Sequence, residues 1–298
     1  MIIVSGYATT SHDVLSSGFI YNARTEQSTP LPNDILPVLE GFSAVSNDEY
    51  MYVIGGWNYE DGFFDTVYRL SLETYKWSTM APMGTARYCC VSVLLGDCIY
   101  VFGGSNLVLV ERYSIVGNTW EDLPNMPALG CLWTAALRNE IYVFGPTDRY
   151  SREHSLIVFD TVLLEWRTVV NMPGRRDRPA GPAVVIQHRY LVLIAGCCPN
   201  IRETAGCLIY DCSINRWSST PASMNMITAP HRHTAAVLDG KIVVAGGRSR
   251  GQFLSTMECI GACDVLEYAP LHYPVPQIYF NRKLQLGRSH DDDHDDVA

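Results

Sequence analysis

Residues 99–120 read IYVFGGSNLVLVERYSIVGNTW, and this stretch decides the fold. A run of β-branched and aromatic residues ends at Gly103-Gly104, a polar loop follows, and Trp120 stands seven positions after Tyr113. The same order of features recurs along the chain. The runs that end in a glycine pair, or in its remnant, are residues 51–56, 99–104, 141–145, 191–196 and 242–247. Repetition at about 50 residues predicts small sheets stacked in an array.

Each repeat divides into four strand-like runs. In the repeat quoted above, the runs are residues 88–95, 99–102, 108–113 and 119–123. Turn-forming residues separate them, so the unit is expected to be an antiparallel meander. One such sheet cannot bury both of its faces alone. Sheets packed face to face around an axis bury one another, which is the arrangement of a propeller.

The seven-residue step between an apolar residue and a tryptophan gives the third and fourth strands their pattern. It recurs as Leu70 to Trp77, Phe159 to Trp166 and Tyr210 to Trp217. Tyr21 and Ser28 show the same step, so residues 1–32 are interpreted as an eroded copy of the unit. In the last copy, Tyr268 stands near the tryptophan position.

Together these features resemble kelch repeats, and the resemblance covers about residues 1–270. It rests on the doublets Gly55-Gly56, Gly103-Gly104 and Gly246-Gly247, on the third-strand aromatic residue and on the fourth-strand tryptophan. Pro146 after Gly145, Ala195 before Gly196, and Ser28 depart from the pattern. The resemblance implies an all-β fold, a six-bladed kelch-type β-propeller with four-stranded antiparallel blades.

Counting strands sets the expected domain. Six second strands end near Gly6, Gly56, Gly104, Gly145, Gly196 and Gly247, which assigns residues 1–280 to the propeller and residues 281–298 to a disordered acidic His/Asp tail. Only five first strands are found, so the first blade lacks its innermost strand. Either a stretch such as Val275–Phe280 supplies it, or the chain is a fragment that begins mid-blade.

Composition narrows the functional classes. The net charge is −9 without a basic stripe, so no nucleic-acid partner is expected. No run is long enough for a membrane span, and the start has no signal-peptide pattern. The ten cysteines show no C-x-x-C spacing. We therefore interpret them as free thiols in the cytoplasm, while a redox role for one of them stays open.

In such a blade, the 2–3 and 4–1 connections emerge on one face, here called the wide-loop face. The short turns, such as Gly96-Asp97 and Gly117-Asn118, form the opposite, narrow-turn face. Arginines gather in the wide loops of the later repeats: Arg149, Arg175, Arg178, Arg202, Arg232, Arg248 and Arg250. Because guanidinium groups bind carboxylates bidentately, we predict a protein or peptide ligand with an acidic segment. The alternative is that these arginines are ordinary solvated charges.

Aromatic residues of the earlier repeats are candidate anchors for that partner: Trp57, Tyr59, Phe63, Phe64, Tyr88 and Trp133. Arg87 and Arg232 precede first strands. In similar kelch domains this position points to the mouth of the central channel, where arginines contact acidic ligands. The structural alternative is an arginine that donates hydrogen bonds to exposed loop carbonyls.

Catalytic signatures are missing from the sequence. There is no Walker loop, G-x-S-x-G or H-E-x-x-H motif, and His231 with His233 is a thin signal for a metal. We expect a non-catalytic protein without cofactor or metal. The resemblance to the propeller of kelch-like (BTB-kelch) substrate adaptors implies substrate recognition for a cullin-type ubiquitin ligase, lacking the N-terminal domain. Alternatives are an actin-binding scaffold and a sugar-metabolising or metal-dependent kelch enzyme.

Overall fold

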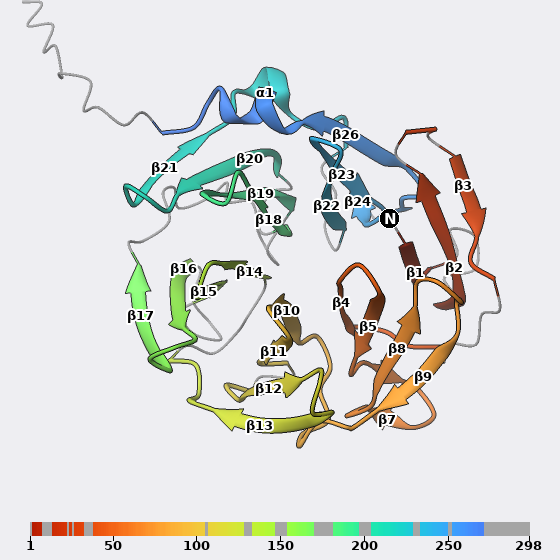
Figure 1. Ribbon diagram of the computed structural model, residues 1–298. Helices are drawn as coiled ribbons and strands as arrows, with labels where there is room; N and C mark the ends of the chain where they lie inside the picture. Colours follow the sequence, from red (N-terminus) through yellow and green to blue (C-terminus); the bar gives the residue numbers. More distant parts are fainter. Residues whose placement is uncertain are drawn as a thin grey trace, which may run out of the picture.

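The computed structural model describes most of the chain between residues 2 and 270. The described residues are 2–7, 14–22, 24–25, 27–32, 38–104, 107–127, 133–146, 154–169, 181–196, 204–228, 233–249 and 252–270. They form an all-β structure in which antiparallel sheets surround a central axis (Figure 1).

Four sheets have the predicted four antiparallel strands, paired in chain order. The β4–β9 sheet comprises β4 (Ser43–Ser46), β5 (Tyr50–Ile54), β8 (Val67–Ser71) and β9 (Trp77–Met80). The β10–β13 sheet comprises β10 (Val91–Leu95), β11 (Cys98–Phe102), β12 (Val110–Ser114) and β13 (Thr119–Leu123). The β14–β17 sheet comprises β14 (Trp133–Leu137), β15 (Glu140–Pro146), β16 (His154–Asp160) and β17 (Glu165–Val169). The β18–β21 sheet comprises β18 (Ala183–Ile186), β19 (Tyr190–Gly196), β20 (Thr204–Asp211) and β21 (Arg216–Ser219).

Two sheets have three strands in the described part of the chain. The β1–β3 sheet comprises β1 (Ile2–Tyr7), β2 (Val14–Asn22) and β3 (Gln27–Pro30). The β22–β26 sheet comprises β22 (Thr234–Leu238), β23 (Lys241–Ala245) and β26 (Met257–Gly261). Small extra elements are the hairpins β6 (Trp57–Asn58) with β7 (Gly62–Phe63) and β24 (Arg248–Ser249) with β25 (Gln252–Phe253), and η1 (Ala222–Met224).

The first strands stand nearest the axis. In the order β4, β10, β14, β18 and β22, each packs beside the next, while β9, β13, β17 and β21 lie at the rim (Figure 1). Five sheets thus supply a first strand, as the five first strands counted in the sequence predicted, and the β1–β3 sheet supplies none within the described residues. The described residues therefore show five blades with an inner strand, whereas six complete blades were expected. Val275–Phe280, the predicted substitute, and the tail from residue 281 lie outside those residues.

The last sheet corrects one expectation. Tyr268 is not in a fourth strand; it follows α1 (Ala262–Leu266), a short helix that comes directly after β26. Ala262 and Val265 are both buried in the core cluster that the β18–β21 and β22–β26 sheets share. A helical turn places residues three apart on one face, so it covers the apolar sheet without a strand. Within the described residues, no helix is long and apolar enough to cross a membrane.

The tryptophans occupy equivalent places in successive sheets. Tyr113 pairs with Trp120, Phe159 with Trp166 and Tyr210 with Trp217, and the ring centroids of these pairs are 5.0, 4.9 and 4.7 Å apart. The eroded first copy keeps the same register, because Tyr21 pairs with Ser28. The indole nitrogen of Trp120 donates to the Ala81 carbonyl and that of Trp166 to the Pro124 carbonyl, so each is bonded to the residue directly after the fourth strand of the preceding sheet.

The glycine doublet lets the connection from one sheet pass close to the next. Gly55 has φ of +63°, and a Cβ there would lie 2.6 Å from the carbonyl oxygen of Arg87. The amide of Gly56 donates to that same oxygen at 2.8 Å. A side chain at Gly55 would therefore clash with backbone in addition to its strained φ. The doublet fixes the segment that carries Arg87 and Tyr88 against the β4–β9 sheet.

Candidate protein-binding surface

Two connections that were predicted to share the wide-loop face meet beside the β4–β9 sheet. The β6–β7 hairpin lies in the connection from β5 to β8, and Tyr88 lies in the connection from β9 to β10. The Phe63 and Tyr88 rings are stacked, with centroids 5.9 Å apart and planes 6° apart. Trp57 meets Tyr88 edge-on at 6.3 Å and Tyr59 edge-on at 6.4 Å. We call Trp57, Tyr59, Phe63 and Tyr88 the aromatic corner.

Much of the aromatic corner faces solvent. The exposed fraction is 91% for Tyr59 and 53% for Phe63, while Trp57 and Tyr88 are half-buried. In the described part of the chain, Tyr268 is the other exposed aromatic residue. Exposed aromatic rings that contact one another are typical of protein interfaces, because they bury large area with few rotatable bonds.

The backbone beneath the aromatic corner is firmly held. Trp57 and Glu40 exchange two backbone hydrogen bonds of 2.8 Å, and the Phe64 amide donates to the Gly56 carbonyl at 2.9 Å. The hairpin turn is closed by the Asn58 side chain, whose Oδ1 accepts from the Asp61 amide at 2.6 Å. Gly41 leaves room for Tyr88, since a Cβ there would lie 2.3 Å from Cε2 of that ring.

Arg87 has a different role from the one predicted at the channel mouth. Its side chain is fully buried and forms a 2.6 Å ion pair from Nη2 to Oε1 of Glu111. Nη1 donates to the carbonyls of Gly103 and Leu109 at 2.6 and 2.9 Å. Arg87 therefore joins the β9–β10 connection to the β10–β13 sheet and is not available to a ligand. The structural alternative, hydrogen bonds to exposed loop carbonyls, is right about the type of acceptor and wrong about its exposure, because the bond to Gly103 is buried and the bond to Leu109 is partly buried.

Arg248 is half-buried rather than extended into solvent. It lies in β24 directly after Gly246-Gly247, as Trp57 lies after Gly55-Gly56. Arg248 pairs with Phe253 in the small hairpin, as Trp57 pairs with Phe63. The guanidinium carbon of Arg248 lies 5.4 Å from the Phe253 ring centroid, a cation–π contact within the chain.

The other predicted arginines fall outside the described residues: Arg149, Arg175, Arg178, Arg202, Arg232 and Arg250.

Comparison with known proteins identifies the family of the repeat. The kelch motif matches residues 40–84, 86–127 and 229–260, which contain the β4–β9, β10–β13 and most of the β22–β26 sheets. Kelch-like protein 38 from Homo sapiens is 30% identical over 252 residues, covering 80% of this chain and 40% of that protein. The protein is a kelch-repeat β-propeller. Kelch repeat and BTB domain-containing protein 2 of Ectromelia virus is 26% identical over 192 residues, 57% of this chain and 34% of the viral protein. The chain thus spans about 40% or less of the length of these relatives.

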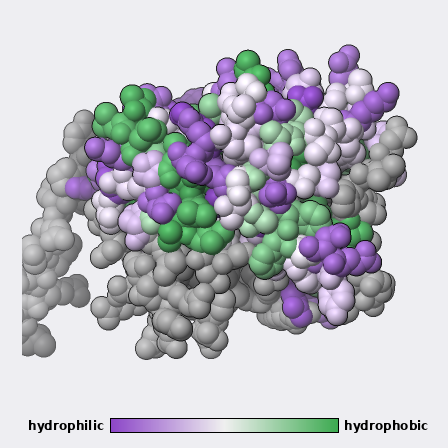
Figure 2. All heavy atoms as spheres, turned by 90° about the horizontal axis from the view of Figure 1, so that it is seen from below, coloured by the Kyte–Doolittle hydropathy of each residue, from purple (hydrophilic) through white to green (hydrophobic). Residues whose placement is uncertain are grey.

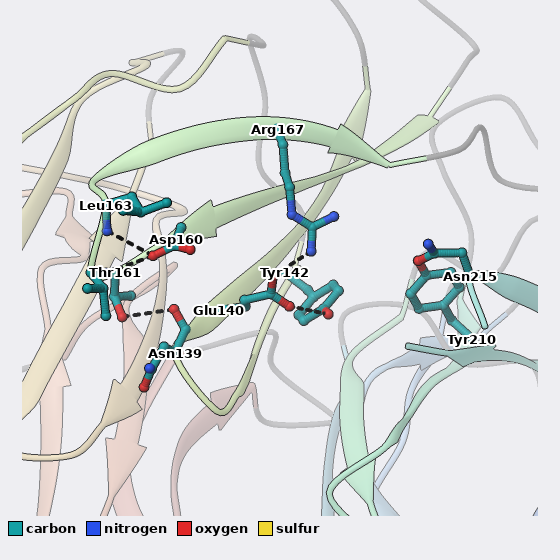
Figure 3. A network of polar contacts seen from close by, with 10 residues as sticks. Asn139, Glu140, Tyr142, Asp160, Thr161, Leu163, Arg167, Tyr210 and Asn215 are labelled. Carbon is teal, nitrogen blue, oxygen red and sulfur yellow. Dashed lines mark hydrogen bonds and ion pairs between the residues drawn. The ribbon is translucent and has the colours of Figure 1, made fainter. Parts of the chain in front are cut away.

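The narrow-turn face of the kelch propeller holds a polar network that was not predicted from the sequence (Figure 3). The Glu140 carboxylate accepts from the Tyr142 hydroxyl at 2.7 Å and pairs with Arg167 at 2.5 Å. In the next sheet, the carboxylate of buried Asp211 accepts hydrogen bonds from Nε and Nη2 of Arg189. Burial alone would raise the pKa of Asp211, but the bonds from Arg189 and Ser213 hold it below its ordinary value. The groups are paired with one another, which indicates a structural network.

The described cysteines and His233 differ in how far they are buried. Seven cysteines are free thiols: Cys89, Cys90, Cys98, Cys207, Cys212, Cys259 and Cys263. Burial raises the pKa of Cys90 to about 12 and that of Cys212 to about 11, so neither is a thiolate at neutral pH. His233 is buried with Nε2 3.2 Å from the Ile194 carbonyl. No three His, Cys, Asp or Glu side chains among the described residues lie close enough to hold a metal together.

Apolar surface away from the aromatic corner is scattered. On the side of the propeller seen in Figure 2, hydrophobic residues reach the surface in separate places with hydrophilic residues between them. Val116, in the turn between β12 and β13, and Val162 with Leu163, in the turn between β16 and β17, are well exposed on the narrow-turn side. These aliphatic turns provide a control surface for mutagenesis.

Proposed function

We propose that this kelch propeller is a non-catalytic protein-interaction module that selects a protein partner through its wide-loop face. The observation that carries the proposal is the aromatic corner, where Tyr59 and Phe63 are exposed yet fixed in contact with neighbouring rings. Ordered aromatic anchors lose little conformational entropy on binding, so they supply most of the affinity of many interfaces.

The biological role proposed for this recognition is that of a substrate adaptor for a cullin-type ubiquitin ligase in the cytoplasm. The relatives are a kelch-like protein and a protein whose name includes a BTB domain, and the chain matches only 34–40% of their length. In this proposal the propeller binds the target, and ligase recruitment belongs to a separate part of such a protein. The free thiols of the described cysteines fit a reducing compartment.

The proposed propeller has six blades. The β1–β3 sheet lies between the β22–β26 and β4–β9 sheets in Figure 1, and Nε of Arg24 is 3.0 Å from Oδ2 of Asp239 in the β22–β23 turn. This contact links the first sheet to the last. A first strand for the β1–β3 sheet would complete the sixth blade, and Val275–Phe280 remains our candidate for it.

An acidic segment of the partner is proposed to lie over the later blades. The proposal rests on the arginines of the sequence, of which Arg248 is now accounted for by its contact with Phe253. Charge reversal at Arg175, Arg178 and Arg202 tests it. Weakened partner binding is expected, and unchanged binding would remove the acidic segment from the proposal.

Affinity capture tests the recognition role. The whole chain is compared with Tyr59→Ala/Phe63→Ala and with the control Val162→Ser/Leu163→Ser on the narrow-turn side. We expect a target that the wild type and the control retain and the aromatic variant loses. Because excess propeller would shield the target from the ligase, the cellular level of that target should rise when the chain is overexpressed. Recovery of actin alone, or a target whose level and ubiquitylation never respond, would overturn the adaptor role.

A further inference from the structure

The carboxylates around the aromatic corner indicate which charge its ligand would carry. Glu60 and Asp61 form the hairpin turn beside Tyr59, Asp65 follows Phe63 and Phe64, and all three are exposed. Over residues 38–66 and 81–90 the sole Lys or Arg is Arg87, which is buried and paired with Glu111. The corner is therefore an aromatic surface bordered by acids, with no accessible cation from these two segments.

A second hairpin of the propeller, β24–β25, shows an arginine bound at the position equivalent to the aromatic corner. In β24–β25, the residue after the glycine doublet is Arg248, and its guanidinium lies over Phe253. In β6–β7, the corresponding residues are Trp57 and Phe63, so both positions are aromatic and no arginine is built in. The same hairpin framework thus appears once with a cation on its ring and once with exposed rings beside acids.

Resting on the proposed recognition role, we propose that the aromatic corner binds a basic segment of the partner, with a Lys or Arg side chain placed against Tyr59 and Phe63. The ring faces attract the cation, and Glu60 and Asp61 provide carboxylates near the same place. The hairpin is already ordered by the Asn58–Asp61 bonds and by the Trp57–Glu40 pair, so binding orders little of the propeller. This basic segment is distinct from the acidic segment proposed over the later blades.

The test uses fluorescence polarisation with a labelled peptide of alternating arginine and glycine. A matched peptide carries citrulline, which keeps the shape of arginine and removes its charge. The whole chain should bind the arginine peptide, and replacing arginine by citrulline should weaken binding by about tenfold. Raising the salt concentration should also weaken binding, because exposed charges are screened.

Variants locate the binding. Tyr59→Ala/Phe63→Ala and Glu60→Lys should each weaken binding of the arginine peptide by about tenfold. Two controls should bind like the wild type: Val162→Ser/Leu163→Ser, and Glu73→Lys, an equal charge reversal at an exposed residue in the β8–β9 turn of the same sheet. Tyr59 and Glu60 are exposed, so their replacement leaves the fold intact, as circular dichroism should verify.

The outcomes separate this inference from the recognition role. Three results would overturn the proposal that the aromatic corner binds a basic segment. They are equal binding of the arginine and citrulline peptides, equal effects of Glu60→Lys and Glu73→Lys, and no binding of the arginine peptide by the wild type. If captured targets still depended on Tyr59 and Phe63, the recognition role would stand without it. If neither captured targets nor the arginine peptide depended on the aromatic corner, both proposals would fall.

Discussion

Replacing Arg87 by methionine tests whether this arginine is structural. The substitution removes an ion pair with Glu111, in which both side chains are almost completely buried, and two hydrogen bonds to the Gly103 and Leu109 carbonyls. Removing one partner of a buried pair costs about 3–5 kcal/mol, because the other charge stays buried without compensation. Glu111 keeps the amide of Gly84, at 2.7 Å, as its remaining donor. At roughly 2 °C per kcal/mol for a chain of this size, the thermal midpoint should fall by about 6–10 °C.

The assay is urea unfolding followed by tryptophan fluorescence, with thermal melting by circular dichroism. The matched control is Arg112→Met in the same sheet, because Arg112 pairs with Glu121 in a partly exposed ion pair. An exposed pair contributes about 0–1 kcal/mol, so this control should unfold close to the wild type. Arg87→Met/Glu111→Leu removes both charges and should lose several kcal/mol less than the two single variants summed.

Binding measurements on Arg87→Met separate a structural role of Arg87 from a role in recognition. The backbone of Arg87 holds Gly56 and Phe64, and the methionine variant keeps that backbone. The folded variant should therefore bind targets and the arginine peptide like the wild type at low temperature. Equal stability of Arg87→Met and Arg112→Met would refute the reasoning, as would weaker binding in a fully folded Arg87→Met protein.

Three further predictions concern the strained glycines, the accessibility of two cysteines, and the dependence of stability on pH. Gly55→Ala should destabilise the protein more than Gly62→Ala in urea unfolding: both glycines have positive φ, a left-handed cost of about 1–2 kcal/mol, but only Gly55 faces a carbonyl at 2.6 Å. At pH 8, iodoacetamide should modify exposed Cys89 in the native protein and leave buried Cys90 intact until unfolding, as mass spectrometry of the peptides will show. Stability should fall as pH rises from about 9 towards 12, since the folded state keeps the Cys90 proton that the unfolded state releases; a flat pH profile would count against this burial.

The sequence predicted the repeat because its signals are local. Tyr113 and Trp120 are joined by a short hairpin, so a fixed spacing brings them opposite each other in β12 and β13. The same step predicted the register of Tyr21 and Ser28, even without a tryptophan. The end of the ring was harder. Nothing in residues 257–270 breaks the expected strand spacing, and α1 forms where Ala262 and Val265 enter the core between the β18–β21 and β22–β26 sheets.

The aromatic corner was predicted in its members but not in its geometry. Trp57, Tyr59 and Tyr88 were candidates because they are large aromatic residues in loops, a statement about composition. Their contact depends on Gly41 and Gly55, whose missing side chains allow the β9–β10 connection to approach the β6–β7 hairpin. The Glu140–Arg167–Tyr142 network had no signal, because its charged residues look like ordinary surface residues of a turn and a strand.

Arg87 shows why an arginine in a binding loop is hard to interpret from sequence. Glu111 and Glu258 occupy equivalent positions, paired with Val101 and Val244. Each accepts amides from the connection that leaves the preceding sheet, Gly84 in one case and Ile227 with Thr228 in the other. The carboxylate is therefore the feature that these two repeats share, and among the described residues the buried arginine accompanies only Glu111. An arginine in this connection is structural where such a carboxylate faces it, so the decisive residue lies 24 positions later, on another strand.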